Sequence, residues 1–231
     1  MMKKKTFKHK EPAIVLEDLT TSESDSGRWY NSPIGSLPSV TTVTGWKKSR
    51  FFAKWRKDNP EESRRVCSRG NRLHKVIEDY LNNEFDPEAM IGEGVASLAP
   101  PIQNVMELFA QLKPELDKID NIHALEVPLW SEAMMLAGRV DCVAEYDGKL
   151  SIIDFKGSTR AKSKSDVKNY FMQATAYAVA WQERTGQAID NFAILMATEE
   201  GINQVFQGNP MDHVKTLLET IEEYHKTMQP A

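Results

Sequence analysis

The 231-residue chain has little cysteine, no long apolar run and little net charge. Its two cysteines, Cys67 and Cys142, are far apart in the sequence and cannot build a four-cysteine zinc or iron-sulfur site, so a reducing compartment is the default. No apolar run approaches the roughly 20 residues that a membrane-spanning helix needs. The start is basic but lacks the apolar stretch of a secretory signal. We therefore expect a cytoplasmic protein with no membrane partner.

The net charge of −4 is small, but it is unevenly distributed. Residues 46–75 contain 11 Lys or Arg against 3 Asp or Glu, a net +8, and residues 1–45 carry +1, so residues 76–231 carry −13. A basic segment on an acidic body indicates a polyanionic partner held at one place. The pI near 5.8 argues against a general nucleic-acid coat protein.

The chain divides into a polar start and a longer patterned part. Residues 1–36 predict a flexible N-terminal arm, and residues 37–231 fit a single domain. Apolar periodicity predicts helices over residues 69–82, 102–119, 166–184 and 211–227. Strands are predicted over residues 124–130, 138–156 (as a hairpin), 191–198 and 202–207. Pro128 suggests that the first strand is an edge strand or contains a bulge.

Residues 46–57 interleave aromatic side chains with cations. The spacing of Phe51, Phe52 and Trp55 suits an amphipathic helix that buries its aromatic rings, and we favour this interpretation. The alternative is that one of these rings stacks on a base while the lysines hold phosphates.

The hairpin is the clearest local pattern in the chain. Asp147-Gly148 between alternating apolar residues predicts a type I′ turn, which needs positive φ at both central residues. If these two residues form the whole loop, Tyr146 pairs with Lys149, and every later pair follows from that register.

That register places Asp141 directly opposite Asp154, on the same face as Lys156 and with Arg139 beside them. Carboxylates whose Cβ atoms lie about 5 Å apart across a ladder repel each other. A solvated surface hairpin is one explanation. The strands are apolar on both faces, however, and charges in a strand interior to a sheet are costly unless they are paired or bind a metal. We therefore expect a divalent metal between the carboxylates, with the lysine alongside.

His74 lies at the edge of the apolar stripe of its helix, so it faces partly inward. It is either a satisfied boundary residue or a ligand, since imidazole is a competent ligand for manganese. Gly70, one turn earlier on the same face, lets another backbone or a phosphate come close. His74 with Asp141 and Asp154 would form an N,O,O site able to hold Mn²⁺ or Mg²⁺.

Two further groups follow the hairpin. Gln173 and Tyr177 share a helix face. Either Tyr177 packs and Gln173 is solvated, or the pair positions DNA or a catalytic side chain. Arg160, Lys162 and Lys164 form either a flexible cationic loop or a contact for backbone phosphates.

Together these residues resemble the motifs of the PD-(D/E)XK nuclease superfamily and, within it, of the RecB-type exonucleases. The four motifs are Gly70-x-x-x-His74, Gly138-Arg-Val-Asp141, Asp154-Phe-Lys156 and Gln173-x-x-x-Tyr177. Each is weak alone, but four in the family's order, on the expected helix, strands and helix, are specific. The resemblance covers roughly residues 37–200. The segment from Leu37 to Val43 is most similar to the mitochondrial genome maintenance exonuclease group and its phage relatives.

The resemblance implies a restriction-endonuclease-like α/β core, in which helices flank a central mixed sheet, with an N-terminal helical elaboration. It implies hydrolysis of DNA with one or two Mg²⁺ or Mn²⁺ ions. We expect no iron-sulfur cluster, because the four-cysteine cluster of some relatives cannot be built from two cysteines. Our main hypothesis is an exonuclease that prefers single-stranded ends or flaps, working with replication, recombination or repair proteins. The alternatives are a structure- or site-specific endonuclease and a non-catalytic DNA-binding recombination scaffold. The setting would be a bacterial or phage-infected cell, with an organellar matrix left open.

The resemblance also implies roles for individual residues. His74, Asp141 and Asp154 would bind the metal, with the Phe155 carbonyl as a further ligand. Lys156 would orient or activate the attacking water, or neutralise charge on the phosphate.

Three further residues complete the expected catalytic set. Gln173 and Tyr177 would support the site and the DNA, and Glu126, in the preceding strand, would assist. For contact with DNA we expect the basic and aromatic side chains Lys47, Lys48, Arg50, Trp55, Arg69, Arg72, Arg160, Lys162 and Lys164.

Overall fold

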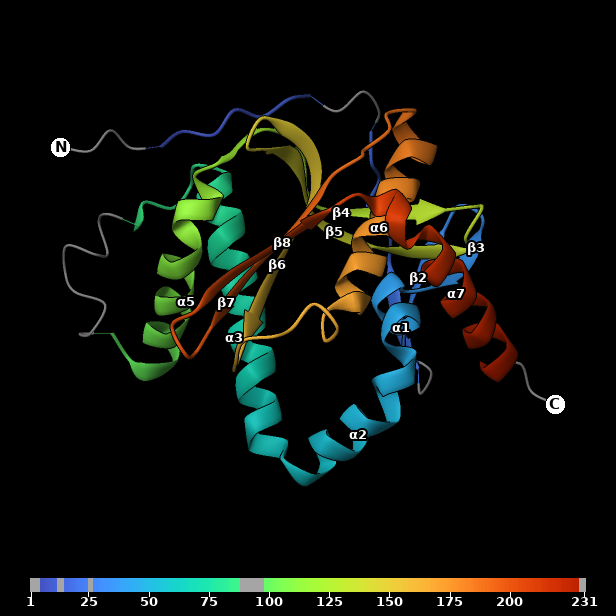
Figure 1. Ribbon diagram of the computed structural model, residues 1–231, viewed down its shortest axis with the longest axis horizontal. Coiled ribbons are helices and arrows are strands. Elements are labelled where there is room, and N and C mark those ends of the chain that lie inside the picture. The colour runs from blue at the N-terminus through green and yellow to red at the C-terminus, as the bar shows by residue number, and fades with distance from the viewer. Residues whose placement is uncertain (1–4, 12–14, 25–26, 88–97, 229–231) are drawn as a thin grey trace.

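A mixed five-stranded sheet forms the centre of the computed structural model, which describes all residues except 1–4, 12–14, 25–26, 88–97 and 229–231 (Figure 1). Its strands, in spatial order, are β4 (Ile119–Ser131), β5 (Leu136–Tyr146), β6 (Lys149–Ser158), β7 (Phe192–Thr198) and β8 (Asn203–Gly208). β6 and β7 are parallel, and the other neighbours are antiparallel. β4 is an edge strand, so Pro128 lies where a missing backbone N–H is tolerated, as predicted.

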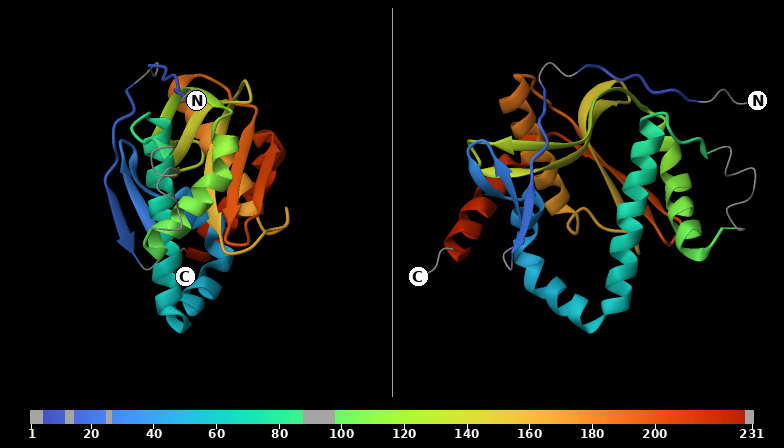
Figure 2. Two further views of the ribbon diagram at one scale, coloured as in Figure 1. Left: turned by 90° about the vertical axis from the view of Figure 1, so that its left-hand side faces the viewer. Right: turned by 180° about the vertical axis from the view of Figure 1, so that it is seen from behind.

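Helices cover both faces of the sheet, which confirms the predicted α/β architecture (Figures 1 and 2). One face packs against α3 (Pro60–Leu81) and α5 (Pro100–Leu116), and the other against α6 (Lys168–Thr185) and α7 (Val214–Met228). Successive residues of a strand point to opposite faces. Ile152 of β6 therefore joins the core under α6, and Ile153 joins the core under α3 and α5.

The predicted helices and strands are present, with longer or shifted bounds. The helix that holds His74 begins at Pro60, nine residues before the predicted start, with proline in its first turn. A short 3₁₀ turn, η3 (Pro210–His213), precedes α7. Within the described part of the chain, no helix combines the length and the apolar character needed to cross a membrane.

Residues 21–38 form a separate antiparallel sheet, and all of them up to residue 36 were expected to belong to a flexible arm. Its strands are β1 (Thr21–Ser24), β2 (Gly27–Ser32) and β3 (Gly35–Pro38). Tyr30 and Leu37 of this sheet are buried against Ala137 of β5, and further upstream Phe7 is buried against Tyr80 of α3. These strands are short and polar and pair with one another, but their buried side chains pack against residues distant in sequence. The division into an arm and a nuclease domain stays a prediction.

The chain then forms a helical arch, made of α1 (Val40–Gly45), the 3₁₀ turn η1 (Trp46–Lys48), α2 (Ser49–Asp58) and the first half of α3. The arch extends below the sheet in Figure 1 and is seen from behind in Figure 2. Ser39 caps α1, because its Oγ accepts a hydrogen bond from the Thr42 N–H at 3.0 Å.

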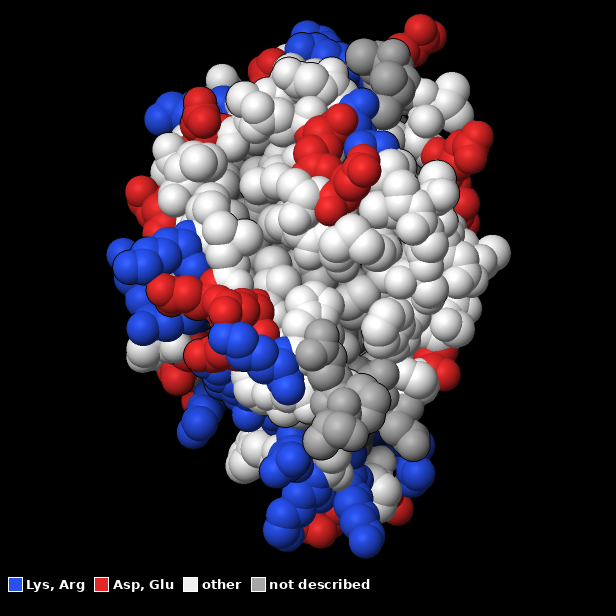
Figure 3. Space-filling view, turned by 90° about the vertical axis from the view of Figure 1, so that its right-hand side faces the viewer, with Lys and Arg blue, Asp and Glu red and all other residues white. Residues whose placement is uncertain are grey.

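The interpretation that α2 buries its aromatic side chains is wrong. Phe51 is 67% exposed, Phe52 is 45% exposed, and no residue of α2 is buried. The physical reason is position, because α2 forms the apex of the arch, away from both sheet cores. Figure 3 shows basic side chains gathered over this lower end of the molecule.

Candidate active site

The β5–β6 hairpin has the predicted register up to the charged residues. Tyr146 pairs with Lys149, and the Asp147-Gly148 turn has φ values of 50° and 76°, as a type I′ turn requires.

The pairing of β5 with β6 ends one step before the two carboxylates, at Cys142 and Ile153. Asp141 does not form a ladder pair with Asp154, because its Oδ2 accepts a hydrogen bond from the Phe155 N–H at 2.9 Å. The predicted direct opposition is therefore replaced by a bond from side chain to backbone. This bond satisfies one carboxylate oxygen and avoids a face-to-face pair of like charges.

β4 is irregular at the same level of the sheet. Glu126 has φ of 49°, a left-handed value that is uncommon for a residue other than glycine. A residue in this conformation breaks the alternation of side chains along a strand. The Glu126 carboxylate consequently reaches α3, where its Oε1 lies 3.4 Å from His74 Nδ1.

His74, Glu126 and Asp141 form a cluster of potential metal ligands, with one ligand atom each, all within 4.8 Å of one another. His74 Nδ1 lies 3.7 Å from Asp141 Oδ2. Burial lowers the pKa of His74, but the Asp141 and Glu126 carboxylates outweigh burial and raise it to about 9. The arrangement thus strongly favours positive charge between these side chains. One imidazole and two carboxylates also match the donors that Mn²⁺ accepts, so the residues fit a divalent cation.

Asp154 lies beside this cluster and is only 4% exposed. Lys156 Nζ is 2.7 Å from its Oδ1 and 2.6 Å from its Oδ2. Oδ2 is buried and accepts no well-directed hydrogen bond from the described residues, so the lysine neutralises it by charge. Burial raises the pKa of Asp154, and Lys156 opposes that shift. In this arrangement Asp154 pairs with the lysine, so its role as a metal ligand, and that of the Phe155 carbonyl, stay predictions.

Lys156 keeps its proton. Burial lowers the pKa of Lys156, but the Asp154 and Asp141 carboxylates outweigh burial and raise it. The Lys156 ammonium lies 5.1 Å from the centre of the Tyr170 ring, which adds a cation–π contact.

α6 supplies the other predicted motif. Tyr177 is buried and packs on β5, where a Cβ added at Gly138 would lie 2.8 Å from Tyr177 Oη. Gly138 therefore makes room for Tyr177, which couples two of the four motifs. Gln173 is buried too, and its Nε2 donates to Thr44 Oγ1 at 3.3 Å, which ties α6 to α1.

Sequence reasoning missed Tyr170 as a site residue, although a signal was available. Tyr170 lies three residues before Gln173 and seven before Tyr177, so all three share a helix face.

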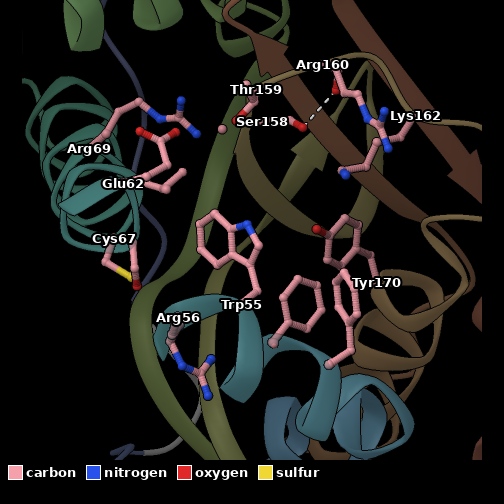
Figure 4. A pocket seen from close by; sticks show the side chains of 15 residues that line it. Trp55, Arg56, Glu62, Cys67, Arg69, Ser158, Thr159, Arg160, Lys162 and Tyr170 are labelled. Atoms are coloured by element: carbon pink, nitrogen blue, oxygen red, sulfur yellow. Dashed lines mark hydrogen bonds between the residues drawn. The ribbon is translucent and has the colours of Figure 1, made fainter. Parts of the chain in front are cut away.

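A cavity of about 560 Å³ opens next to Lys156, between the arch and the end of β6 (Figure 4). Figure 4 shows the rings of Trp55 and Tyr170 turned toward the same space. Gly157, directly after Lys156, lies at its sheet side. The lining residues come from α2, α3, the end of β6 with the loop that follows it, and α6. They include Phe51, Phe52, Trp55, Arg56, Cys67, Arg69, Gly157, Arg160, Lys162 and Tyr170.

The structure separates the predicted DNA-contacting residues into two groups. Those that line this cavity are Trp55, Arg69, Arg160 and Lys162. The others lie elsewhere. Lys47 pairs with Glu223 at 2.5 Å, and Lys48 donates to the Asp166 carbonyl. Arg50 is exposed on α2, and Arg72 and Lys164 line other cavities. Phe51, Phe52 and Arg56 also line the cavity. Sequence reasoning favoured a buried position for the two rings and did not select Arg56.

Gly70 is on α3 in open space, because a Cβ added there would meet no atom within 4 Å. No described part of the protein makes the close approach for which the sequence suggested this glycine.

Fold and site together define an α/β protein in which the Asp154–Lys156 ion pair adjoins a His–carboxylate cluster at the end of the β5–β6 hairpin. The model of the PD-(D/E)XK nuclease superfamily matches residues 48–228. Since the match covers most of the sequence, the chain belongs to this superfamily.

Curated relatives include mitochondrial genome maintenance exonuclease 1 of Mus musculus, 28% identical over 158 residues, which cover 62% of this chain and 43% of the relative. The Homo sapiens protein is 28% identical over 167 residues, covering 64% of this chain and 45% of that protein. The chain thus spans less than half the length of these relatives. A crystal structure of a presumed exonuclease from Eubacterium rectale has a TM-score of 0.50 and 15% identity, over 71% of this chain and 65% of that one, which shows the fold alone.

Proposed function

We propose that the protein is a metal-dependent DNA exonuclease that prefers single-stranded ends or flaps. The observation that carries the proposal is the Asp154–Lys156 pair, which adjoins the His74–Glu126–Asp141 cluster and also contacts Tyr170, a residue that lines an aromatic, basic cavity. Membership of the nuclease superfamily and the exonuclease relatives support the chemistry.

The residues divide the chemical work between them. His74, Glu126 and Asp141 would hold Mg²⁺ or Mn²⁺, with Asp154 adjacent. Such an ion supplies a water of lowered pKa and a positive charge against the scissile phosphate. Lys156, which keeps its proton, faces the phosphate as a cation and stabilises the negative charge that develops on it.

The cavity wall favours a single strand. Phe51, Phe52, Trp55 and Tyr170 offer rings on which bases can stack, and Arg160 and Lys162 offer charge to the phosphates. Stacking on side chains requires unpaired, exposed bases, which a duplex does not present. Replication, recombination and repair generate such ends and flaps, so we place the protein in these processes, with their proteins as partners.

The test is digestion of end-labelled DNA in Mg²⁺, in Mn²⁺ and in EDTA, with single-stranded, blunt, flapped and closed circular substrates. We expect metal-dependent release of short products from single-stranded ends and flaps, and none from Asp154→Ala at equal DNA binding. Cleavage of closed circular duplex at internal sites would favour the endonuclease alternative. Persistent DNA binding with no cleavage under any of these conditions would favour the non-catalytic scaffold.

A further inference from the structure

Arg139 bridges the backbone of the site to the N-terminal part of the chain. Its Nη1 donates to the carbonyl of Glu126, and its Nη2 donates to Asp18 Oδ1 at 2.6 Å. The guanidinium thus donates hydrogen bonds from two of its nitrogens to acceptors on two separate segments of the chain. Neither donor reaches the carboxylates of Asp141 and Asp154, beside which the sequence register had placed the arginine.

Glu126, whose carbonyl Arg139 contacts, has a left-handed backbone with φ of 49°. A non-glycine residue in the left-handed region is strained and persists only where its surroundings hold it. β4 and β5 pair on both sides of Glu126 and Asp141, but these two residues do not pair with each other. A carbonyl outside the ladder still requires a donor. Arg139 supplies that donor.

We propose that Arg139, itself held by Asp18, is a positioning residue that fixes the Glu126 backbone and so keeps the Glu126 carboxylate with His74 and Asp141. Neither Arg139 nor Asp18 is a metal ligand. The inference rests on the metal site of the proposed function and adds a supporting contact from the N-terminal segment. It gives the arginine of the Gly138-Arg-Val-Asp141 motif a role of its own.

Charge and position predict opposite effects at Arg139. Arg139 is a cation near a site for a cation, so loss of its charge alone would tighten metal binding. If Arg139 instead holds Glu126 in place, its loss weakens metal binding. Residues that orient metal ligands typically contribute about 10- to 100-fold in metal affinity.

The experiment is calorimetric titration of the full chain with Mn²⁺ alone, together with the melting temperature of each variant without metal. We expect about 10- to 100-fold weaker Mn²⁺ binding for Arg139→Ala. Arg139→Lys should also weaken binding, because lysine keeps the charge but lacks the planar fork. Asp18→Ala should weaken binding at most about fivefold, since its ion pair is exposed.

Arg28→Ala is the matched control. Arg28 also forms an exposed ion pair, with Glu23 at 2.8 Å, but it lies in the β1–β2 sheet. Its loss should leave Mn²⁺ affinity unchanged.

Several results would overturn the inference. Unchanged or tighter Mn²⁺ binding by Arg139→Ala would show that the arginine does not position a ligand. A lower melting temperature with unchanged Mn²⁺ affinity would show a purely structural role. If wild type binds Mn²⁺ but cleaves no DNA, the proposed function fails while the Arg139 inference stands. If wild type binds no Mn²⁺, both fail.

Discussion

The two sides of the candidate active site, the sheet and the arch, are built in opposite ways. On the sheet side, Asp141, Asp154 and Lys156 are largely buried, and each is held by a hydrogen bond or an ion pair. On the arch side, Phe51 and Phe52 stand exposed on a helix that buries no residue. The sheet side holds charges in a defined geometry, which chemistry on one bond requires. The arch side offers adaptable rings and cations, which suit a substrate of varying sequence.

This difference separates the expected effects of substitutions. Changes on the sheet side should alter the rate of the chemical step or the stability of the fold. Changes on the arch side should alter DNA affinity and leave the rate of the chemical step and the stability of the fold largely unchanged. Single substitutions on each side test that separation.

The largest effect is expected at Lys156. Under the proposed function, Lys156→Ala removes the cation that would face the phosphate, so kcat should fall about 100- to 1000-fold, with little change in DNA affinity. Lys149→Ala, an exposed lysine on the same strand, is the control and should retain full activity. Single-turnover digestion measures the rate, and fluorescence anisotropy measures binding. An equal loss of rate in both variants would remove Lys156 from the site.

The next effect concerns stability. Gly138→Ala places a Cβ 2.8 Å from Tyr177 Oη and 3.0 Å from Cε1, and such overpacking costs about 1–3 kcal/mol of unfolding free energy. Tyr177→Phe in the same chain removes the nearest atom and should recover part of the loss. Gly70→Ala, which meets no atom within 4 Å, should instead stabilise α3 by up to about 1 kcal/mol. Urea unfolding measures all three, and equal effects at the two glycines would contradict the Gly138–Tyr177 packing.

On the arch side, Trp55→Ala should weaken single-stranded DNA binding by about 1–3 kcal/mol, the value of one stacked base, with kcat nearly unchanged. The melting temperature should hold, because no residue of α2 is buried. Leu218→Ala, a half-exposed apolar residue on α7, is the control and should not change affinity. A lower melting temperature with unchanged affinity would restore the interpretation that the aromatic rings are structural.

The smallest effect is expected where charge ties α3 to the end of β7. The Arg65 guanidinium bonds Glu199 at 2.5 Å and 3.1 Å, and with Arg69 it lowers the pKa of Glu199 below its ordinary 4.5. A lowered carboxyl pKa contributes stability that is present above pH 4.5 and is lost as the pH falls through the lowered value. Unfolding free energy between pH 6 and pH 3 should thus fall more steeply for wild type than for Glu199→Gln. Parallel curves would show that the ion pair contributes nothing.

Much of the sheet side could be predicted because its signals are local. The Asp147-Gly148 turn specified the hairpin register, and the register brought Asp141 and Asp154 to the same level of the sheet. The turn could not reveal that the β5–β6 pairing ends before these carboxylates, because this end depends on the hydrogen bond that the Asp141 side chain accepts from the Phe155 N–H. The helix that holds His74 was likewise evident from its apolar stripe, and its position against the sheet followed from burial of that stripe.

The arch and the contacts of the N-terminal segment could not be predicted in the same way. The spacing of Phe51, Phe52 and Trp55 describes one face of a helix, but not whether anything covers that face. Nor does any pattern near Glu126 reveal that its backbone turns left-handed and that Arg139 bonds its carbonyl.

The sequence alone therefore determined the order of the motifs, the hairpin and the helices that carry His74 and Tyr177, because turns and periodic faces depend on near neighbours. Tertiary structure alone decided three things. Glu126 joins His74 and Asp141, the aromatic rings of α2 face a cavity, and Asp18 reaches the site through Arg139. Each of these depends on segments far apart in sequence, whose meeting is set by the packing of the whole chain.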